Sequence, residues 1–275
     1  MVDKGKTSAF VTWASNQNRI KTVVLTGNRV NNAAVQNKDE IYEWLVAVSE
    51  PDLFLDQISW ADLDLGPILQ DSRYIRNDKP FIRLLFEDGT RFNICLVTPE
   101  KMDEILEKDT LCEIVLDKDN KYGARKKPTD LSRRIKKPSD EQFLYYCDSF
   151  FTEITDVVMY LNHDNLLAAQ IAFARARKPL MSMVESSVSA ESEYTLNPGQ
   201  DRVNLNAYLK DEDYEYLRDT YVRTTKKDLW DGVFKSCVLF RRMGLALAEK
   251  LQVEYPKEMD VHLLKLFRNL WEESR

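Results

Sequence analysis

Residues 20–31 read Ile-Lys-Thr-Val-Val-Leu-Thr-Gly-Asn-Arg-Val-Asn, and this segment decides how the first half of the chain folds. Its apolar part, residues 20–25, is rich in β-branched side chains and is typical of a buried strand. Thr26, Gly27 and Asn28 then favour a tight turn, because glycine adopts backbone angles that other residues avoid. The segment therefore predicts a strand that runs directly into a turn.

Further strand and helix signals follow this turn. Residues 44–48 form a second apolar run, and residues 81–86 and 91–97 flank an Asp88-Gly89 pair. Asp-Gly between two apolar runs is a strong hairpin signal. Thr-Pro-Glu at 98–100 then predicts a helix start, with proline in the first turn. The first half is therefore predicted to be a mixed β-sheet with helices.

The chain changes character at residues 121–138, which contain eight basic residues, the single acid Asp130 and two prolines. Proline discourages regular structure, so we interpret this segment as the connection between two domains. Such a segment is either a solvated linker or a set of cations for a triphosphate or an RNA backbone, through residues 125–127 and 133–137.

Beyond the connector, apolar residues repeat at three- and four-residue spacing over 143–161, 166–183 and 230–251, which predicts helices. The second half is therefore expected to be a helical bundle. The predicted fold class is α+β, with a mixed-sheet domain that includes the connector over residues 1–136. A C-terminal helical-bundle domain follows over residues 137–275.

Composition narrows the class of partner. The chain has 275 residues, with 39 Lys and Arg against 45 Asp and Glu. This mildly negative balance disfavours nucleic acid and anionic membranes as main partners and is compatible with a cationic small molecule. The N-terminus lacks the apolar core of a signal peptide and no apolar run is long enough for a membrane span, so a cytoplasmic protein is expected. Oligomeric state is left open.

The four cysteines are far apart and match neither a metal clip nor a disulfide framework. Because three of them lie in apolar runs, we expect reduced thiols in the core. The cysteines are Cys95, Cys112, Cys147 and Cys237.

Residues 25–31, Leu-Thr-Gly-Asn-Arg-Val-Asn, are the first of several segments that match one enzyme family in order and in spacing. The others are residues 85–88 with 92–96, 128–130, 137–139, 148–151, 239–241 and 255–256. The chain resembles the aminoglycoside 6-adenylyltransferase (streptomycin adenylyltransferase) family of the nucleotidyltransferase superfamily. That resemblance implies a nucleotidyltransferase-type sheet domain and a helical substrate-binding domain.

The resemblance also implies an activity and its cofactors. The family transfers a nucleoside monophosphate from ATP to a hydroxyl of an aminoglycoside such as streptomycin, with Mg²⁺. Its Gly-Ser turn, which brings backbone N–H groups near the triphosphate, corresponds here to Gly27 and Asn28, followed by Arg29. A lysine-rich turn of the family corresponds to residues 199–203, where Arg202 is the candidate substitute for the absent lysines.

The family's metal ligands are Asp-x-Asp on one strand and a third aspartate on a neighbouring strand. Side chains two apart on a strand point the same way, so both carboxylates reach the same pair of ions. Here those positions fall on Ile41, Glu43 and Asn93, so Glu43 is the surviving candidate ligand and catalytic carboxylate. Ile41 and Asn93 are degenerate metal positions. A shifted register would instead present Asp39 or Glu40 beside Glu43.

Two features of the second half have alternative interpretations. Asp164 stands where the family has a glutamate and is the candidate general base for the sugar hydroxyl; alternatively it only caps the following helix. Residues 185–219 carry nine acids, three bases and four tyrosines. That composition suits either a pocket for a polycation or solvated helix faces, and residues 211–213 resemble a helix N-terminus.

The replaced carboxylates make it doubtful that this chain transfers adenylate. Mg²⁺ demands near-octahedral oxygen ligands, which isoleucine cannot provide. An active enzyme would use ATP and Mg²⁺, and slow transfer remains open because triphosphate-bound Mg²⁺ needs few protein ligands. The alternative is a catalytically silent relative that binds a nucleotide, a cationic metabolite or a protein and needs no metal.

Overall fold

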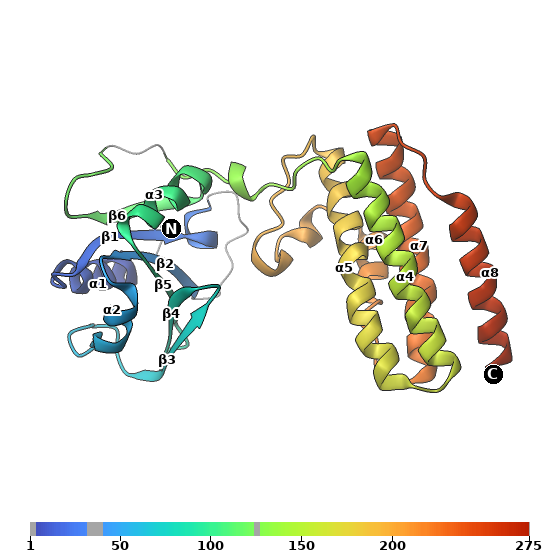
Figure 1. The fold of residues 1–275 in the computed structure, drawn as a ribbon, viewed down its shortest axis with the longest axis horizontal. Helices are drawn as coiled ribbons and strands as arrows, with labels where there is room; N and C mark the ends of the chain where they lie inside the picture. Colours follow the sequence, from blue (N-terminus) through green and yellow to red (C-terminus); the bar gives the residue numbers. More distant parts are fainter. Residues whose placement is uncertain (1–3, 32–40, 124–126, 275) are drawn as a thin grey trace. The chain divides into compact units, whose positions relative to one another are not determined.

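The structure, a computed structural model, describes residues 4–31, 41–123 and 127–274 (Figure 1). The chain divides into two compact units, residues 1–133 (unit 1) and residues 134–275 (unit 2). Unit 1 contains a mixed sheet with helices and unit 2 is helical. The α+β class predicted from the sequence is confirmed.

Within its described residues, unit 1 forms a 6-stranded sheet in the order β3-β4-β5-β2-β1-β6. Strands β2 and β5 run parallel, and the other neighbouring strands are antiparallel. The strands are β1 (Ile20–Thr26), β2 (Ile41–Val48), β3 (Ile68–Arg76), β4 (Lys79–Phe86), β5 (Arg91–Val97) and β6 (Cys112–Asp117).

The two faces of the sheet are packed differently, as the alternation along β2 shows. Tyr42 and Trp44 are buried on one face, in the cluster to which α1 (Lys4–Ser15) and α2 (Pro51–Gln57) contribute. Leu45 and Ala47 lie on the other face, in a smaller cluster with Met102 of α3 (Pro99–Lys108). Glu43 lies on this second face, two residues before Leu45 and so nearer to the start of β2.

Local sequence signals explain the β4–β5–α3 segment. The predicted hairpin is confirmed, with Leu85 paired to Arg91 across the Asp-Gly turn. The predicted helix start is also confirmed: the side-chain oxygen of Thr98 accepts a hydrogen bond from the Lys101 backbone N–H at 3.3 Å, and Pro99 occupies the first turn.

Unit 2 is built from α4 (Asp140–Asn162), α5 (Leu166–Glu191), α6 (Asp211–Arg218), α7 (Lys226–Leu251) and α8 (Lys257–Glu273). Helix α4 begins at a serine cap, where Ser139 Oγ accepts from the Gln142 N–H at 3.2 Å. The core between α4 and α7 is centred on the stacked rings of Phe150 and Phe240, whose centroids are 3.9 Å apart. All three helices predicted from periodicity are confirmed.

The four cysteines are free and buried, as predicted. Burial raises the pKa of each thiol, to about 11 for Cys95 and Cys112 and to about 12 for Cys147 and Cys237. They are therefore neutral, unreactive thiols at physiological pH. Among the described helices, none combines the length and the apolar character needed to cross a membrane.

One buried carboxylate ties α8 to α7. Asp260 is 4% exposed, and its Oδ2 accepts hydrogen bonds from Arg241 Nε at 2.5 Å and from the Tyr255 hydroxyl at 3.1 Å. Burial, and then the charge of Asp260, raise the pKa of Tyr255 far above its ordinary value, so the phenol keeps its proton. Asp260 is therefore the acceptor on which two side chains depend.

Replacing Asp260 with alanine is expected to lower the free energy of unfolding of unit 2 by about 2–3 kcal/mol, because hydrogen bonds to a charged group are lost and Tyr255 is left without an acceptor. Helical circular dichroism during urea unfolding measures this change. Glu258→Ala removes the same charge from an exposed site on the same helix and should cost less than about 1 kcal/mol. Equal losses in both variants would contradict the role assigned to Asp260.

Candidate nucleotide site

The turn after β1 is set by a glycine. Residues Gly27–Val30 form a short 3-10 turn, η1, in which Gly27 has a φ of +77°, a conformation that disfavours any residue with a Cβ. A Cβ at this position would lie 1.9 Å from Oε2 of Glu43. The Glu43 carboxylate therefore lies directly against the Gly27 backbone, so the structure brings these two predicted site residues together.

The other two predicted residues of the turn have different settings. The Asn28 backbone carbonyl closes the turn by accepting from the Asn31 N–H at 3.3 Å. The Arg29 guanidinium lies 4.3 Å from the centre of the Tyr42 ring, and its Nε donates to the Ile41 carbonyl at 3.4 Å. Because the Tyr42 side chain belongs to the face opposite to Glu43, the guanidinium of Arg29 packs on that opposite side of β2.

The strand register places one residue from every strand in a single row across the sheet. Glu43 is paired with Thr26 of β1 on one side and with Asn93 of β5 on the other. The full row is Ser72, Arg83, Asn93, Glu43, Thr26 and Cys112. Directly opposed side chains on one face lie within contact distance, so two of the predicted metal positions, Glu43 and Asn93, are neighbours.

The amide of Asn93 is engaged by an arginine of the next strand. Arg83 Nε donates a hydrogen bond to Asn93 Oδ1 at 3.2 Å. Ile41, the third predicted metal position, is two residues from Glu43 along β2 and therefore on the same face. It is paired with Arg91 of β5. The shifted register that would use Asp39 and Glu40 falls outside the described residues, as do Arg125 and Lys126 of the basic connector.

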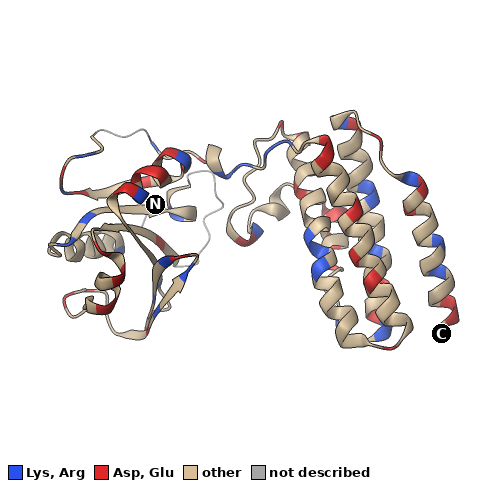
Figure 2. Ribbon diagram, viewed as in Figure 1, with Lys and Arg blue, Asp and Glu red and all other residues tan. Residues whose placement is uncertain are grey.

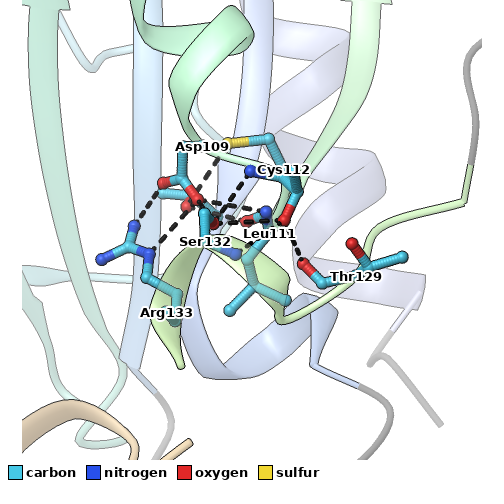
Figure 3. A network of polar contacts seen from close by, with 8 residues as sticks. Asp109, Leu111, Cys112, Thr129, Ser132 and Arg133 are labelled. Atoms are coloured by element: carbon cyan, nitrogen blue, oxygen red, sulfur yellow. Dashed lines mark hydrogen bonds and ion pairs between the residues drawn. The ribbon is translucent and has the colours of Figure 1, made fainter. Parts of the chain in front are cut away.

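A hydrogen-bond network supports the row at its β1–β6 end (Figure 3). Thr26 Oγ1 donates to the Leu111 carbonyl at 3.0 Å. Asp109 accepts from Ser132 Oγ at 2.9 Å and from the Leu111 N–H at 3.1 Å, and it also forms an ion pair with Arg133. The network fixes η2 (Leu131–Arg133) against the start of β6.

The network shifts the pKa values of its two charged members, Asp109 and Arg133. Burial alone would raise the pKa of Asp109, but the hydrogen bonds from Arg133, Leu111 and Ser132 outweigh it and the net pKa is lowered. For Arg133, burial lowers the pKa, but the hydrogen bond and the charge of Asp109 raise it. Cys112 and Glu43 add weaker upward effects, so the net pKa of Arg133 is raised. Arg133 is therefore a cation that is held in place by Asp109. The basic stretch between η2 and α4 is blue in Figure 2.

Sequence reasoning identified neither Arg83 nor Arg133 individually as a site residue. The residue opposite Asn93 depends on the register of the β4–β5 hairpin, which no local pattern around Arg83 reveals. The sequence indicates Arg133 only as one of the cations of the basic connector. Within the described residues, no group of three or more His, Cys, Asp and Glu side chains has the arrangement to hold a metal ion.

In unit 2, Arg202 forms an ion pair with Glu185, with Arg202 Nε 2.6 Å from Glu185 Oε1. Glu185 is 8% exposed on α5, and burial raises its pKa although the charge of Arg202 opposes that shift. Arg202 itself lies in the 3-10 turn η3 (Gln200–Arg202) and has a φ of +64°. The predicted triphosphate cation is thus engaged with a buried carboxylate of its own unit.

Asp164 lies at the opposite end of α5 from Glu185. Leu166, where α5 begins, precedes Glu185 by 19 residues, or roughly 30 Å along the helix, so the structure does not bring Asp164 together with Arg202, the ion-pair partner of Glu185. Asp164 forms an exposed ion pair with Lys226 at 2.7 Å. Its predicted role as helix cap is wrong by one residue: the N-cap of α5 is Asn165, and Asp164 precedes it with a φ of +56°.

Several acids of the 185–219 stretch are paired within the protein. Arg242 Nη1 lies 2.6 Å from Asp213 and 3.0 Å from Glu212, and its guanidinium carbon lies 5.1 Å from the centre of the Tyr216 ring. Asp219 is paired with Lys235 at 2.5 Å. Residues 211–213 form the first turn of α6, as predicted. These pairs offset part of the negative charge that the sequence offers to a cationic ligand.

Comparison with known proteins gives a consistent result. The sequence profile described as streptomycin adenylyltransferase matches residues 3–270. An aminoglycoside 6-adenylyltransferase of Bacillus subtilis is 26% identical over 257 residues, covering 90% of each chain, and one of Campylobacter jejuni is 27% identical over 252 residues, covering 89% of this chain and 87% of the relative. A crystal structure of an aminoglycoside 6-adenyltransferase from Bacillus subtilis aligns with 98% of both chains at 21% identity and a TM-score of 0.49.

Proposed function

Because this chain belongs to the streptomycin adenylyltransferase family, we propose that it binds a nucleoside triphosphate beside the Gly27–Val30 turn and transfers adenylate to an aminoglycoside very slowly or not at all. The observation that carries the first half is the contact between the Gly27 backbone and the Glu43 carboxylate. It indicates that position 27 accepts only glycine, the residue type that the family's phosphate-binding turn also has there.

The second half rests on the chemistry of the available donors. Ile41 has no donor atom, and the amide oxygen of Asn93 accepts from Arg83. Among the paired positions 41, 43 and 93, which the structure describes, only Glu43 offers a carboxylate. Two Mg²⁺ ions need several anionic or neutral oxygen ligands at about 2.0–2.1 Å, so this set does not fit the pair of ions that the family implies.

The ion pairs of unit 2 also argue against efficient transfer to an aminoglycoside. The family's acceptor is an aminoglycoside, whose ammonium groups would be recognised by carboxylates. In this chain Glu185, Asp213 and Asp219 are each held in an ion pair with a residue of unit 2. Asp164, the candidate base, is roughly 30 Å along α5 from Glu185. These ion pairs leave the three carboxylates less able to recognise a polycation.

Nucleotide binding at the turn is tested by Gly27→Ala. The added methyl group displaces Glu43 and imposes a strained φ, so we expect ATP affinity to fall by about tenfold or more. Isothermal titration calorimetry with a non-hydrolysable ATP analogue, in Mg²⁺ and again in EDTA, measures the change.

Gly66→Ala is the matched control for this variant. Gly66 has a φ of +86°, but a Cβ there would meet nothing within 4 Å, so alanine brings the same backbone strain without the contact. Its nucleotide affinity should stay within about twofold of that of the unmodified protein. Absence of saturable binding in both buffers, or equal affinities for the two variants, would refute nucleotide binding at this turn.

A further inference from the structure

The sheet face that carries Glu43 has a charge pattern opposite to the one expected of a metal site. On the Glu43 face, beyond the apolar cluster under α3, the described side chains of β4, β5 and β2 include Arg83, Arg91 and Glu43. Two positive charges thus accompany one negative charge, where the family pattern has three aspartates. A surface of this sign repels Mg²⁺ and attracts phosphate.

Arg83 is the cation of this face whose side chain is positioned by a hydrogen bond. It is exposed, and its hydrogen bond to Asn93 fixes it one strand from the amide and two strands from Glu43. Two strand spacings correspond to roughly 10 Å between backbones. A guanidinium carries five N–H donors, and the contact with Asn93 uses one of them. Arginine binds phosphate with two parallel hydrogen bonds, which a point charge does not.

At the opposite end of the row, Arg133 forms an ion pair with Asp109, which offsets its charge. The excess positive charge of this face therefore comes from Arg83 and Arg91. Glu43 is also positioned against Gly27, so the row and the phosphate-binding turn are parts of one surface.

We propose that Arg83 supplies the positive charge that the family draws from Mg²⁺, so that this chain binds the triphosphate of a nucleotide without a divalent metal. This inference rests on the proposed nucleotide binding. Mg²⁺ lowers the negative charge of the triphosphate and gains few protein ligands here. Addition of Mg²⁺ should therefore leave the affinity unchanged or weaken it.

The test is calorimetric titration of the full chain with ATP in EDTA and in Mg²⁺, for the unmodified protein and for Arg83→Ala. We expect saturable binding in EDTA, and a loss of about 10- to 100-fold in Arg83→Ala, the range for a lost charge-assisted hydrogen-bond pair. Arg83 is exposed, so the variant should fold normally.

Arg76→Ala is the matched control, because Arg76 is an exposed arginine on the neighbouring strand β3 and loses the same charge. Its affinity in EDTA should stay within about twofold of the unmodified protein. Binding in Mg²⁺ but not in EDTA, or an unchanged affinity in Arg83→Ala, would overturn the inference while nucleotide binding stands. Absence of binding in both buffers would overturn both.

Discussion

The variant carrying Ile41→Asp, Glu43→Asp and Asn93→Asp is expected to bind ATP in Mg²⁺ about 100-fold more tightly than the unmodified protein. The strand register places all three positions on one face of β2 and β5. Each added carboxylate forms a close charge pair with the metal, worth roughly 4 kcal/mol at an effective dielectric near 20 before desolvation. Even if about a third of that sum survives, the affinity changes by about two orders of magnitude.

The same variant should lose binding in EDTA, because three carboxylates repel the triphosphate when no metal bridges them. Calorimetry in both buffers measures this reversal, and a rise in melting temperature on addition of Mg²⁺ alone reports metal binding independently. Ile41→Asn, with Glu43 and Asn93 unchanged, is the neutral control. A folded triple variant whose ATP affinity shows no dependence on Mg²⁺ would mean that these positions do not face a common ion.

Much of the fold follows from local sequence signals. The run at residues 20–25 and Gly27 predict β1 and its turn, and the Asp-Gly pair predicts the β4–β5 hairpin, because each signal acts within a few residues. Strand β3 (Ile68–Arg76) was not predicted. It is an edge strand paired with β4, and most of its side chains are exposed, so its sequence lacks an apolar alternation.

The candidate site was predictable only in part. The resemblance to a family identifies Glu43 and Asn93, and the register shows them to be paired. It does not identify Arg83, because cross-strand neighbours are set by the register of the whole sheet. It also carries over Asp164 and Arg202 as candidate site residues, whereas the length of α5 separates Asp164 from Glu185, the ion-pair partner of Arg202. A match to a family motif identifies a residue but does not give its distance in space from a residue near the other end of the same helix.

The proposed metal-independent nucleotide binding depends on the positive charge around Glu43. The face of the sheet that carries Glu43 also carries Arg83 and Arg91, so two positive charges accompany one carboxylate there. The scaffold depends on apolar packing such as that of Tyr42 and Trp44, which is independent of the polar face. Chemistry at the site can therefore change without loss of the fold.

The most direct test of this account is adenylyl transfer from radiolabelled ATP to streptomycin by the unmodified protein in saturating Mg²⁺, with an active family member as positive control. Because the positions that the family resemblance assigns to three metal carboxylates hold Ile41, Glu43 and Asn93, we expect turnover at least about a thousandfold below the ordinary enzyme range of ~1–10³ s⁻¹. Labelled product that forms no faster than in a reaction without protein would agree with this expectation. Turnover near 1 s⁻¹ would contradict it, and would show that Glu43 and the substrate's own phosphates suffice to hold the metal.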